Sequence, residues 1–310
     1  MKRDERADDA SRSVSRRRAI GVLAAAIAPG LASVRPAGIL RFAQDDRAAQ
    51  DDRMARAGRL KQSVSRWCYG RIPLDDLCEA AKKIGYRSVE LLDEKDWPVV
   101  AKHGLVCAMA NGFGPIPVGF NDSANHDKLV ADGSAMIPKA AAAGVPNIVC
   151  FSGNRRGMSD ADGIANCIAG FKRLTPVAEQ HGVTLCLEVL NSKVDHKDYH
   201  ADHTAWAVKV VEGVASPRLK ILYDIYHMQR NEGNIINTID WCWDEIAYYQ
   251  IGDNPGRKEP GTGEVNFKNI FKHVHEKGYR GVWGMEHGNF KEGKEGEAAL
   301  IKAYREHDVD

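Results

Sequence analysis

The sequence lacks an excess of charge of either sign. Its 310 residues contain 43 Lys and Arg against 42 Asp and Glu, which gives a formal net charge of +1 at pH 7. A near-neutral chain argues against a nucleic-acid-binding protein, because the binding face of such a protein usually makes it strongly basic. Hydrophobic residues make up 44% of the chain and charged residues 27%, which is typical of a globular protein. This composition excludes a disordered, collagen-like or polytopic membrane protein.

Paired cysteines are also missing. The seven cysteines are an odd number, and no two of them have C-x-x-C spacing. Most lie in apolar segments, such as Cys150 in NIVC and Cys186 in TLCLEV. We therefore expect reduced thiols buried in a hydrophobic core, and neither a disulfide framework nor a zinc–thiolate site.

The N-terminal region has no apolar run of membrane-spanning length. Its uncharged stretch, residues 19–34, has sixteen residues and contains two glycines and a proline, whereas a spanning helix needs about 20 apolar residues. The preceding Ser15-Arg16-Arg17-Arg18 resembles the start of a twin-arginine export signal. We predict a signal segment at 1–34, no stable membrane insertion and a periplasmic location. The alternatives are an unstructured extension or a translation start at Met54, and both predict a cytoplasmic location.

Residues 35–60 have the composition of a disordered linker. AQDDR occurs at 43–47 and again at 49–53, without an apolar period that could bury a face. Residues 1–60 hold 13 Lys and Arg and 8 Asp and Glu, so residues 61–310 hold 30 and 34, a net charge of −4. The two parts are therefore expected to be different kinds of polypeptide.

Residues 61–310 alternate short β-rich runs with longer helical patterns. The β-rich runs are residues 63–69, 88–92, 106–110, 147–152, 184–190, 219–227, 245–251 and 281–286. The helical patterns include residues 74–84, 128–143, 163–181, 203–214 and 267–277. Eight strand–helix repeats in about 250 residues predict an α/β fold, a single (β/α)₈ TIM barrel over 61–310. An open doubly wound sheet is the alternative, but no G-x-G-x-x-G or P-loop follows the first strand, which disfavours its nucleotide-binding forms.

Polar residues stand where four consecutive predicted strands end. Glu188, Asp224, Gln250 and Glu286 each follow a run of apolar residues. Active sites of TIM barrels lie at these carboxyl ends, so the four side chains are expected to converge. Three carboxylates and an amide offer only oxygen ligands, which suit Mg²⁺ or Mn²⁺, with Zn²⁺, Co²⁺ and Ni²⁺ as alternatives. The other interpretation is that each acid is a separate strand-end partner in a salt bridge.

Several stretches resemble one enzyme family. LEVLNSKVD, LYDIYHMQ, QIGDNPGRKEPGTGE and GMEH are similar to segments of the hydroxypyruvate isomerase-like members of the xylose isomerase-like barrel superfamily. The resemblance covers roughly residues 61–306 and is strongest from 184 onward. It implies one divalent metal held by Glu188, Asp224, Gln250 and Glu286, with the two glutamates as the acid/base pair.

The resemblance also implies substrate contacts at His227 and Arg257. Each has an alternative interpretation, His227 as a strand-end hydrogen-bonding group and Arg257 as an anchor of its own loop. Asn111 stands where many relatives have a substrate-contacting His, and an amide cannot carry a proton at neutral pH. Glu90 and Glu264 are interpreted as structural or supporting carboxylates rather than catalysts. The other histidine-rich stretch, DHKDYHADH, is not expected to bind a second metal.

The resemblance, together with these residues, implies a metal-dependent isomerase or epimerase. The enzyme would move a proton next to a carbonyl in a small keto acid or sugar through an enediolate, with the metal stabilising that charge. The alternatives are a metal-dependent lyase of the inosose dehydratase kind and a non-catalytic sugar-binding barrel. A metal-dependent endonuclease is disfavoured by the −4 charge of residues 61–310. We expect a small-molecule substrate and no nucleic-acid partner, and the sequence is compatible with a homo-oligomer.

Overall fold

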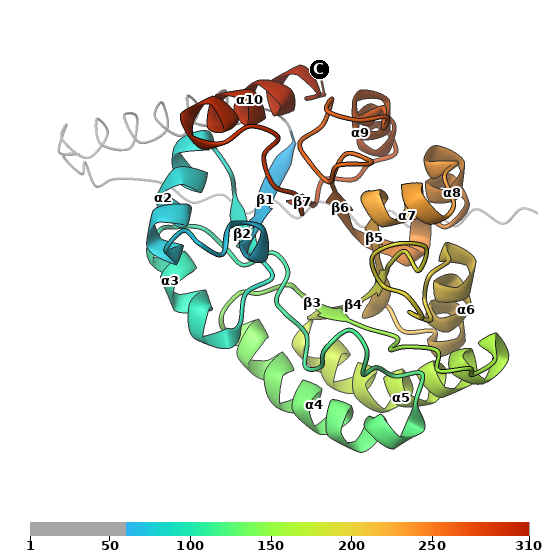
Figure 1. Cartoon of the computed structure of the whole chain (residues 1–310). Helices are drawn as coiled ribbons and strands as arrows, with labels where there is room; N and C mark the ends of the chain where they lie inside the picture. Colours follow the sequence, from blue (N-terminus) through green and yellow to red (C-terminus); the bar gives the residue numbers. More distant parts are fainter. Residues whose placement is uncertain (1–59, 310) are drawn as a thin grey trace, which may run out of the picture. The chain divides into compact units, whose positions relative to one another are not determined.

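Parallel strands surround a central axis, and helices cover them on the outside (Figure 1). The structure is a computed structural model that describes residues 60–309. The strands are β1 (Lys61–Ser65), β2 (Ser88–Glu90), β3 (Asn147–Cys150), β4 (Thr184–Val189), β5 (Leu219–Asp224), β6 (Ile246–Ile251) and β7 (Val282–Met285). They form one seven-stranded sheet in the order β2-β1-β7-β6-β5-β4-β3. The predicted barrel fold is confirmed.

The eighth predicted strand, residues 106–110, makes only isolated bridges. Val106 bridges to Ser88 at the β2 edge, and Ala110 bridges to Ile148 of β3, so this segment lies between the two edge strands. Two features interrupt the ladder of backbone hydrogen bonds there. Leu91 on the neighbouring segment has a left-handed backbone (φ 55°), and the side chain of Asn147 donates a hydrogen bond to the backbone carbonyl of Ala108. The prediction of a regular strand at 106–110 is therefore wrong, although the segment fills the expected place.

Two other predicted strands pass directly into helices before their predicted ends. Residues 66–69 form a short 3₁₀ helix, η1 (Arg66–Tyr69), directly after β1. Residues 225–227 belong to helix α7 (Ile225–Asn231), because the carboxylate of Asp224 accepts a hydrogen bond from the backbone N–H of His227 and so caps that helix. In both places the chain turns as soon as it leaves the barrel.

The remaining helices lie where the sequence predicted helical patterns or join neighbouring elements. They are α2 (Leu74–Ile84), α3 (Trp97–Lys102), α4 (His126–Ala142), α5 (Asp160–His181), α6 (Thr204–Val214), α8 (Ile235–Trp241), α9 (Phe267–Glu276) and α10 (Gly293–Glu306). Three further 3₁₀ turns are η2 (Glu94–Asp96), η3 (Ser123–Asn125) and η4 (Trp243–Glu245). Helix α5 ends at the predicted residue, because Gly182 adopts a left-handed backbone (φ 70°). It begins three residues before the predicted start, because Ser159 caps its N-terminus.

Side chains alternate between two layers along each strand. On β4, Leu185, Leu187 and Val189 belong to the large core between the sheet and the helices, whereas Cys186 belongs to a small cluster inside the barrel. That inner cluster is formed by Ala108, Met109, Val149, Cys186, Leu222 and Tyr248. Because successive strand residues face opposite sides, Glu188 lies on the inner face, two positions beyond Cys186. Every residue of β4 is buried, as expected for a parallel strand covered on both faces.

The predicted signal segment at 1–34 lies outside the described residues. So does the predicted linker, apart from Leu60, which is buried and donates its backbone N–H to the Asp308 carboxylate. Within residues 60–309, no helix is both long enough and apolar enough to cross a membrane.

Candidate active site

Four neighbouring strands place polar side chains on the inner face at their carboxyl ends. Asp224 of β5 and Gln250 of β6 are register partners, and Gln250 pairs in turn with Gly284 of β7. Glu286 follows β7 directly, and its backbone N–H bonds to the carbonyl of Ile251. The fourth predicted residue, Glu188, lies on β4. All four side chains are buried.

The carboxylates form a tight cluster. Ligand atoms of Glu188, Asp224 and His227 lie within 4.8 Å of one another. The Nη2 atom of Arg257 lies 3.2 Å from Oδ2 of Asp224 and 2.9 Å from Oε2 of Glu286. The guanidinium of Arg257 therefore joins two of the carboxylates, and the alternative that it merely anchors its own loop through Glu259 or Glu264 is not what the contacts show.

The pKa values of the clustered acids report this crowding. Burial raises the pKa of Glu188 well above its ordinary value, and the nearby Glu286 and Asp224 raise it further. Burial also raises the pKa of Asp224 strongly, although the positive charge of Arg257 acts in the opposite direction. It is costly to ionise buried carboxylates that lie this close together. The cluster is therefore stabilised when it binds a proton or a cation.

The nitrogen and the oxygen of the Gln250 side-chain amide differ in their hydrogen bonding. Its Nε2 donates to Oε1 of Glu90 at 3.0 Å. Its Oε1 is buried, and no group within residues 60–309 donates a hydrogen bond to it. A buried acceptor without a donor is uncommon in proteins, and it leaves this oxygen available to a cation.

His227 is a neutral imidazole whose hydrogen-bonding roles are set by its neighbours. Its Nδ1 accepts the backbone N–H of Asn191 at 3.2 Å, so the proton is on Nε2. Burial lowers its pKa well below the ordinary value, and Arg257 lowers it further. Nε2 faces Oδ2 of Asp224 at 3.5 Å. The protonated Nε2 is a donor for a ligand oxygen and is not, in this form, a metal ligand.

Arg257 is held between two aromatic rings. Its guanidinium carbon lies 4.7 Å from the ring centroid of Tyr226 and 5.2 Å from that of Trp67. Its Nε donates to the backbone carbonyl of Glu286 at 3.1 Å. Burial lowers the pKa of Arg257, but Glu286 and Asp224 more than offset this and leave the pKa above its ordinary value. The cation is thus fixed beside the acids while part of its side chain stays open to solvent.

Asn111 lies apart from this cluster. Its amide nitrogen donates to Oδ1 of Asp93 at 2.8 Å, and both residues line a surface depression of about 330 Å³ beside the middle of α4. None of the strand-end acids lines that depression. The structure does not bring Asn111 into contact with the other predicted site residues, and its role in substrate binding stays a prediction.

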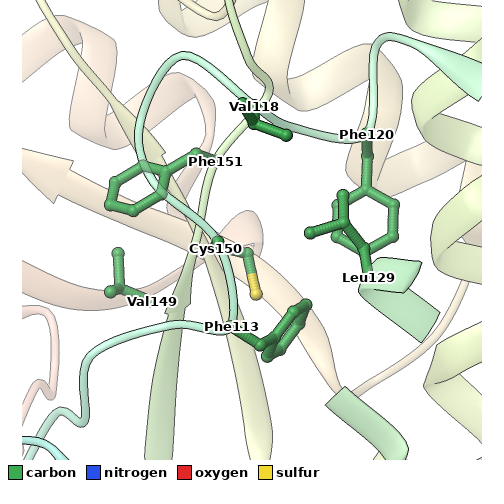
Figure 2. Close-up of a pocket in the computed structure, with 8 residues that line it drawn as sticks. Phe113, Val118, Phe120, Leu129, Val149, Cys150 and Phe151 are labelled. Carbon is green, nitrogen blue, oxygen red and sulfur yellow. The ribbon is translucent and has the colours of Figure 1, made fainter. Parts of the chain in front are cut away.

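An apolar cavity elsewhere in the barrel is unrelated to the acids. Figure 2 shows Cys150 and several aromatic and aliphatic side chains around it. Its volume is about 10 Å³, and it is lined by Phe113, Gly114, Val118, Phe120, Leu129, Val149, Cys150 and Phe151. A cavity of this size with no charged group around it is a packing gap rather than a reaction site.

Sequence reasoning missed groups that surround the acids. Trp67, which follows β1, donates its Nε1–H to Oε1 of Glu286 at 2.7 Å. Asn191, which follows β4, donates to His227, and its Nδ2 also bonds to Asp195 at 2.6 Å. The signal that could have found both is the strand-end rule itself, applied to aromatic and amide residues as well as to acids.

The histidines of DHKDYHADH have separate neighbours. The His196 ring lies 5.2 Å from the His227 ring, Nδ1 of His200 accepts a hydrogen bond from Nδ2 of Asn121 at 3.0 Å, and His203 pairs with Asp202. Within residues 60–309, the group of potential ligands that comes together is Glu188, Asp224 and His227.

Comparisons with known proteins identify the family of the chain. The family model described as "Xylose isomerase-like TIM barrel" matches residues 78–307. The chain belongs to the xylose isomerase-like TIM barrel family. It is 33% identical to the hydroxypyruvate isomerase of Escherichia coli over 223 residues, which cover 67% of this chain and 85% of that protein. It is 28% identical to the 2-oxo-tetronate isomerase of Haemophilus influenzae, over 71% of this chain and 89% of that protein.

Solved structures share the fold. An AP endonuclease, family 2, from Brucella melitensis has a TM-score of 0.71 at 21% identity, covering 81% of this chain and 100% of that chain. The D-psicose 3-epimerase of Clostridium cellulolyticum, solved with D-tagatose, has a TM-score of 0.63 at 18% identity, covering 79% of this chain and 90% of that chain. At these identities the likeness shows the fold alone. The sequence relatives, which are named as isomerases, identify the chain as an isomerase.

Proposed function

We propose that the protein is a divalent-metal-dependent isomerase of small 2-keto acids that carry a neighbouring hydroxyl group. The observation that carries the proposal is the buried group of Glu188 and Asp224 together with Arg257, whose Nη2 contacts both Asp224 and the buried Glu286. The names of the sequence relatives support the substrate class, because hydroxypyruvate and 2-oxo-tetronate are both 2-keto acids. The reaction would move a proton next to the carbonyl through an enediolate.

The residues fit a hard divalent ion such as Mg²⁺ or Mn²⁺. Three carboxylates and the amide oxygen of Gln250 are oxygen donors of the kind that these ions prefer. Two observations support the fit: the Gln250 oxygen is buried without a donor from residues 60–309, and the acids raise one another's pKa. When bound, the ion would supply positive charge to the substrate oxygens as the enediolate forms.

The two glutamates differ in their surroundings, which supports different roles. Oε1 of Glu286 accepts a hydrogen bond from Trp67. Its Oε2 lies 2.9 Å from Nη2 of Arg257 but accepts no hydrogen bond from residues 60–309, so this oxygen is free to take the substrate proton. Glu188 has a strongly raised pKa and is suited to return a proton. Pairs of acids whose environments differ in this way are typical of acid/base sites.

Arg257 and His227 provide the remaining contacts with a keto acid. A guanidinium presents a planar set of donors that matches a carboxylate, so Arg257 would bind the acid group of the substrate. The Nε2–H of His227 would donate to a substrate oxygen. Both groups face Asp224, so the substrate would be anchored beside the acid/base pair.

The test follows the proton. Purified protein loaded with Mg²⁺ or Mn²⁺ is incubated with hydroxypyruvate in D₂O, and the products are followed by NMR. We expect isomerisation with deuterium at the carbon next to the carbonyl, and loss of turnover when a chelator removes the metal. The Glu188→Gln and Glu286→Gln variants should each lose about 10²- to 10⁴-fold in rate, as expected when a general acid or base is removed.

A matched control separates chemistry from general effects of charge. Glu264→Gln changes an exposed glutamate on the loop after β6 and should leave the rate unchanged. Near-normal turnover of the Glu286 variant would contradict its role as base. Loss of water from the substrate would support a lyase, and an unchanged ligand that stays bound would support a sugar-binding barrel.

We also propose export by the twin-arginine route, on the basis of Ser15-Arg16-Arg17-Arg18 and the uncharged stretch after it. Cells expressing the full chain or its Arg16→Lys/Arg17→Lys variant are fractionated. If the chain is exported by this route, the full chain should be found in the periplasm and the double variant in the cytoplasm. The same distribution of both proteins between the two fractions would contradict the proposal.

A further inference from the structure

A second carboxylate lies inside the barrel, close to the proposed metal ligands. Glu90 is the last residue of β2 and is completely buried, while its neighbour Val89 packs in the outer core. Within residues 60–309 it forms no ion pair with a Lys, Arg or His. A buried acid needs hydrogen-bond donors in place of a counter-charge.

Three side chains provide those donors. Ser65 Oγ donates to Oε1 of Glu90 at 2.9 Å, Tyr248 Oη donates to Oε2, and Gln250 Nε2 donates to Oε1 at 3.0 Å. They come from β1, the neighbour of β2 in the sheet, and from β6, three strands away from β2, so Glu90 connects strands that are not all adjacent. All of its partners are buried.

The contact with Gln250 determines which end of that amide is free. A side-chain amide has an acceptor oxygen and a donor nitrogen, whereas a carboxylate only accepts. Glu90 therefore binds the nitrogen, and the amide oxygen remains without a donor from residues 60–309. The opposite orientation would present an NH₂ group at the proposed metal site, and an NH₂ group repels a cation.

Gly284 provides the space for this contact. It is the register partner of Gln250 on β7. A Cβ atom at position 284 would lie 2.8 Å from Cγ of Gln250 and would overlap Oε1 of Glu90. Any larger residue there would push the two side chains apart.

We propose that Glu90 is a positioning residue that holds the Gln250 amide with its oxygen free to bind the metal, and that Gly284 makes room for the pair. The inference rests on the proposed metal-dependent function. Glu90 would not touch the substrate. It would act through Gln250, as groups that orient metal ligands do in other metal sites.

The test measures Mn²⁺ binding to the full chain by calorimetry, with the EPR signal of bound Mn²⁺ as a second readout. Glu90→Gln keeps the size of the side chain but can donate as well as accept, so Gln250 is no longer held in one orientation. We expect about 10- to 100-fold weaker binding and a changed EPR spectrum. The control is Ser65→Ala, which removes a different hydrogen bond to the same oxygen and should have a much smaller effect.

A double-mutant cycle distinguishes positioning from a general loss of structure. If Glu90 acts through Gln250, Glu90→Gln should cause no further loss of affinity in a Gln250→Ala background. An equal loss in both backgrounds would overturn the proposal. If Glu90→Gln does not fold, as judged by circular dichroism, Gly284→Ala decides, because it should weaken Mn²⁺ binding only when Gln250 is present.

The same data distinguish this inference from the function on which it rests. A wild-type protein that does not bind Mn²⁺, Mg²⁺ or other divalent ions would contradict the proposed metal dependence. A wild-type protein that binds Mn²⁺ and a Glu90→Gln variant that binds it equally well would contradict the positioning role alone.

Discussion

Removing the charge of Arg257 should destabilise the metal-free protein far more than the metal-bound protein. Arg257 is the cation that contacts both Asp224 and Glu286, at 3.2 and 2.9 Å. Asp224 is completely buried, and Glu286 is nearly so. Arg257→Met keeps much of the apolar stem between Trp67 and Tyr226 but leaves the carboxylates without their positive partner.

The expected size of the effect follows from burial. Removing one partner of a buried ion pair typically costs about 3–5 kcal/mol, because the other charge stays buried and unpaired. We expect a loss of that order in the free energy of unfolding when a chelator is present. A divalent ion that binds only the folded state stabilises it by about 2.7 kcal/mol at 100 times its Kd. The wild-type protein gains as well, so Mn²⁺ offsets the loss only because the carboxylates that lack Arg257 bind the ion more tightly, which is what we expect for the variant.

We would unfold the wild-type protein and Arg257→Met with urea, once with a chelator and once with Mn²⁺. These curves measure the loss in the free energy of unfolding without and with the ion. Lys258→Met is the control, since it removes a positive charge from the same loop without touching either acid. Two results would refute the reasoning. One is a loss below about 1 kcal/mol in chelator, the value typical of an exposed pair. The other is an equal loss with and without the ion.

Three further predictions concern individual contacts. Trp67→Phe removes the N–H donor to Glu286 and should lower kcat about tenfold with the fold intact, as steady-state kinetics and circular dichroism can check. Burial lowers the pKa of His200, so below pH 6.5 the unfolded chain binds a proton that the folded chain resists. The free energy of unfolding, measured with urea, should therefore fall from pH 7.5 to 5.5, and it should fall less steeply in His200→Gln. The same pH dependence in both proteins would contradict this. In Gly163→Ala, the new Cβ would meet the His200 ring, 2.6 Å from Nδ1, and thermal unfolding should show a loss of about 1–3 kcal/mol.

Much of the fold could be predicted because local signals agree with it. Helix α2 has the predicted bounds, and α5 begins at a capping serine and ends at a glycine that adopts a left-handed backbone. The segment at 106–110 was harder, because its apolar composition is typical of a strand whether or not its backbone forms a continuous ladder. The interruption depends on the backbone of Leu91 and the side chain of Asn147, which lie far from it in sequence.

The site was predictable only where a polar residue interrupts an apolar strand. Glu188, Asp224, Gln250 and Glu286 are visible for that reason, and the structure buries all four. Glu90 carries the same signal in SVELL, but sequence cannot tell a carboxylate that supports a ligand from one that is a ligand. Only its hydrogen bond to Gln250, 160 residues away, makes that distinction.

The sequence by itself determined the barrel, its strand-end acids and the family, because hydrophobic periodicity, helix ends and polar residues after strands are local properties of the chain. The tertiary structure decided which groups meet. Parallel strands are buried on both faces, so their composition does not reveal which side chains point inward. Closing the barrel brought Trp67 to Glu286, Arg257 between two acids, and Glu90 to Gln250. These contacts set the charges and free oxygens on which the proposed chemistry depends.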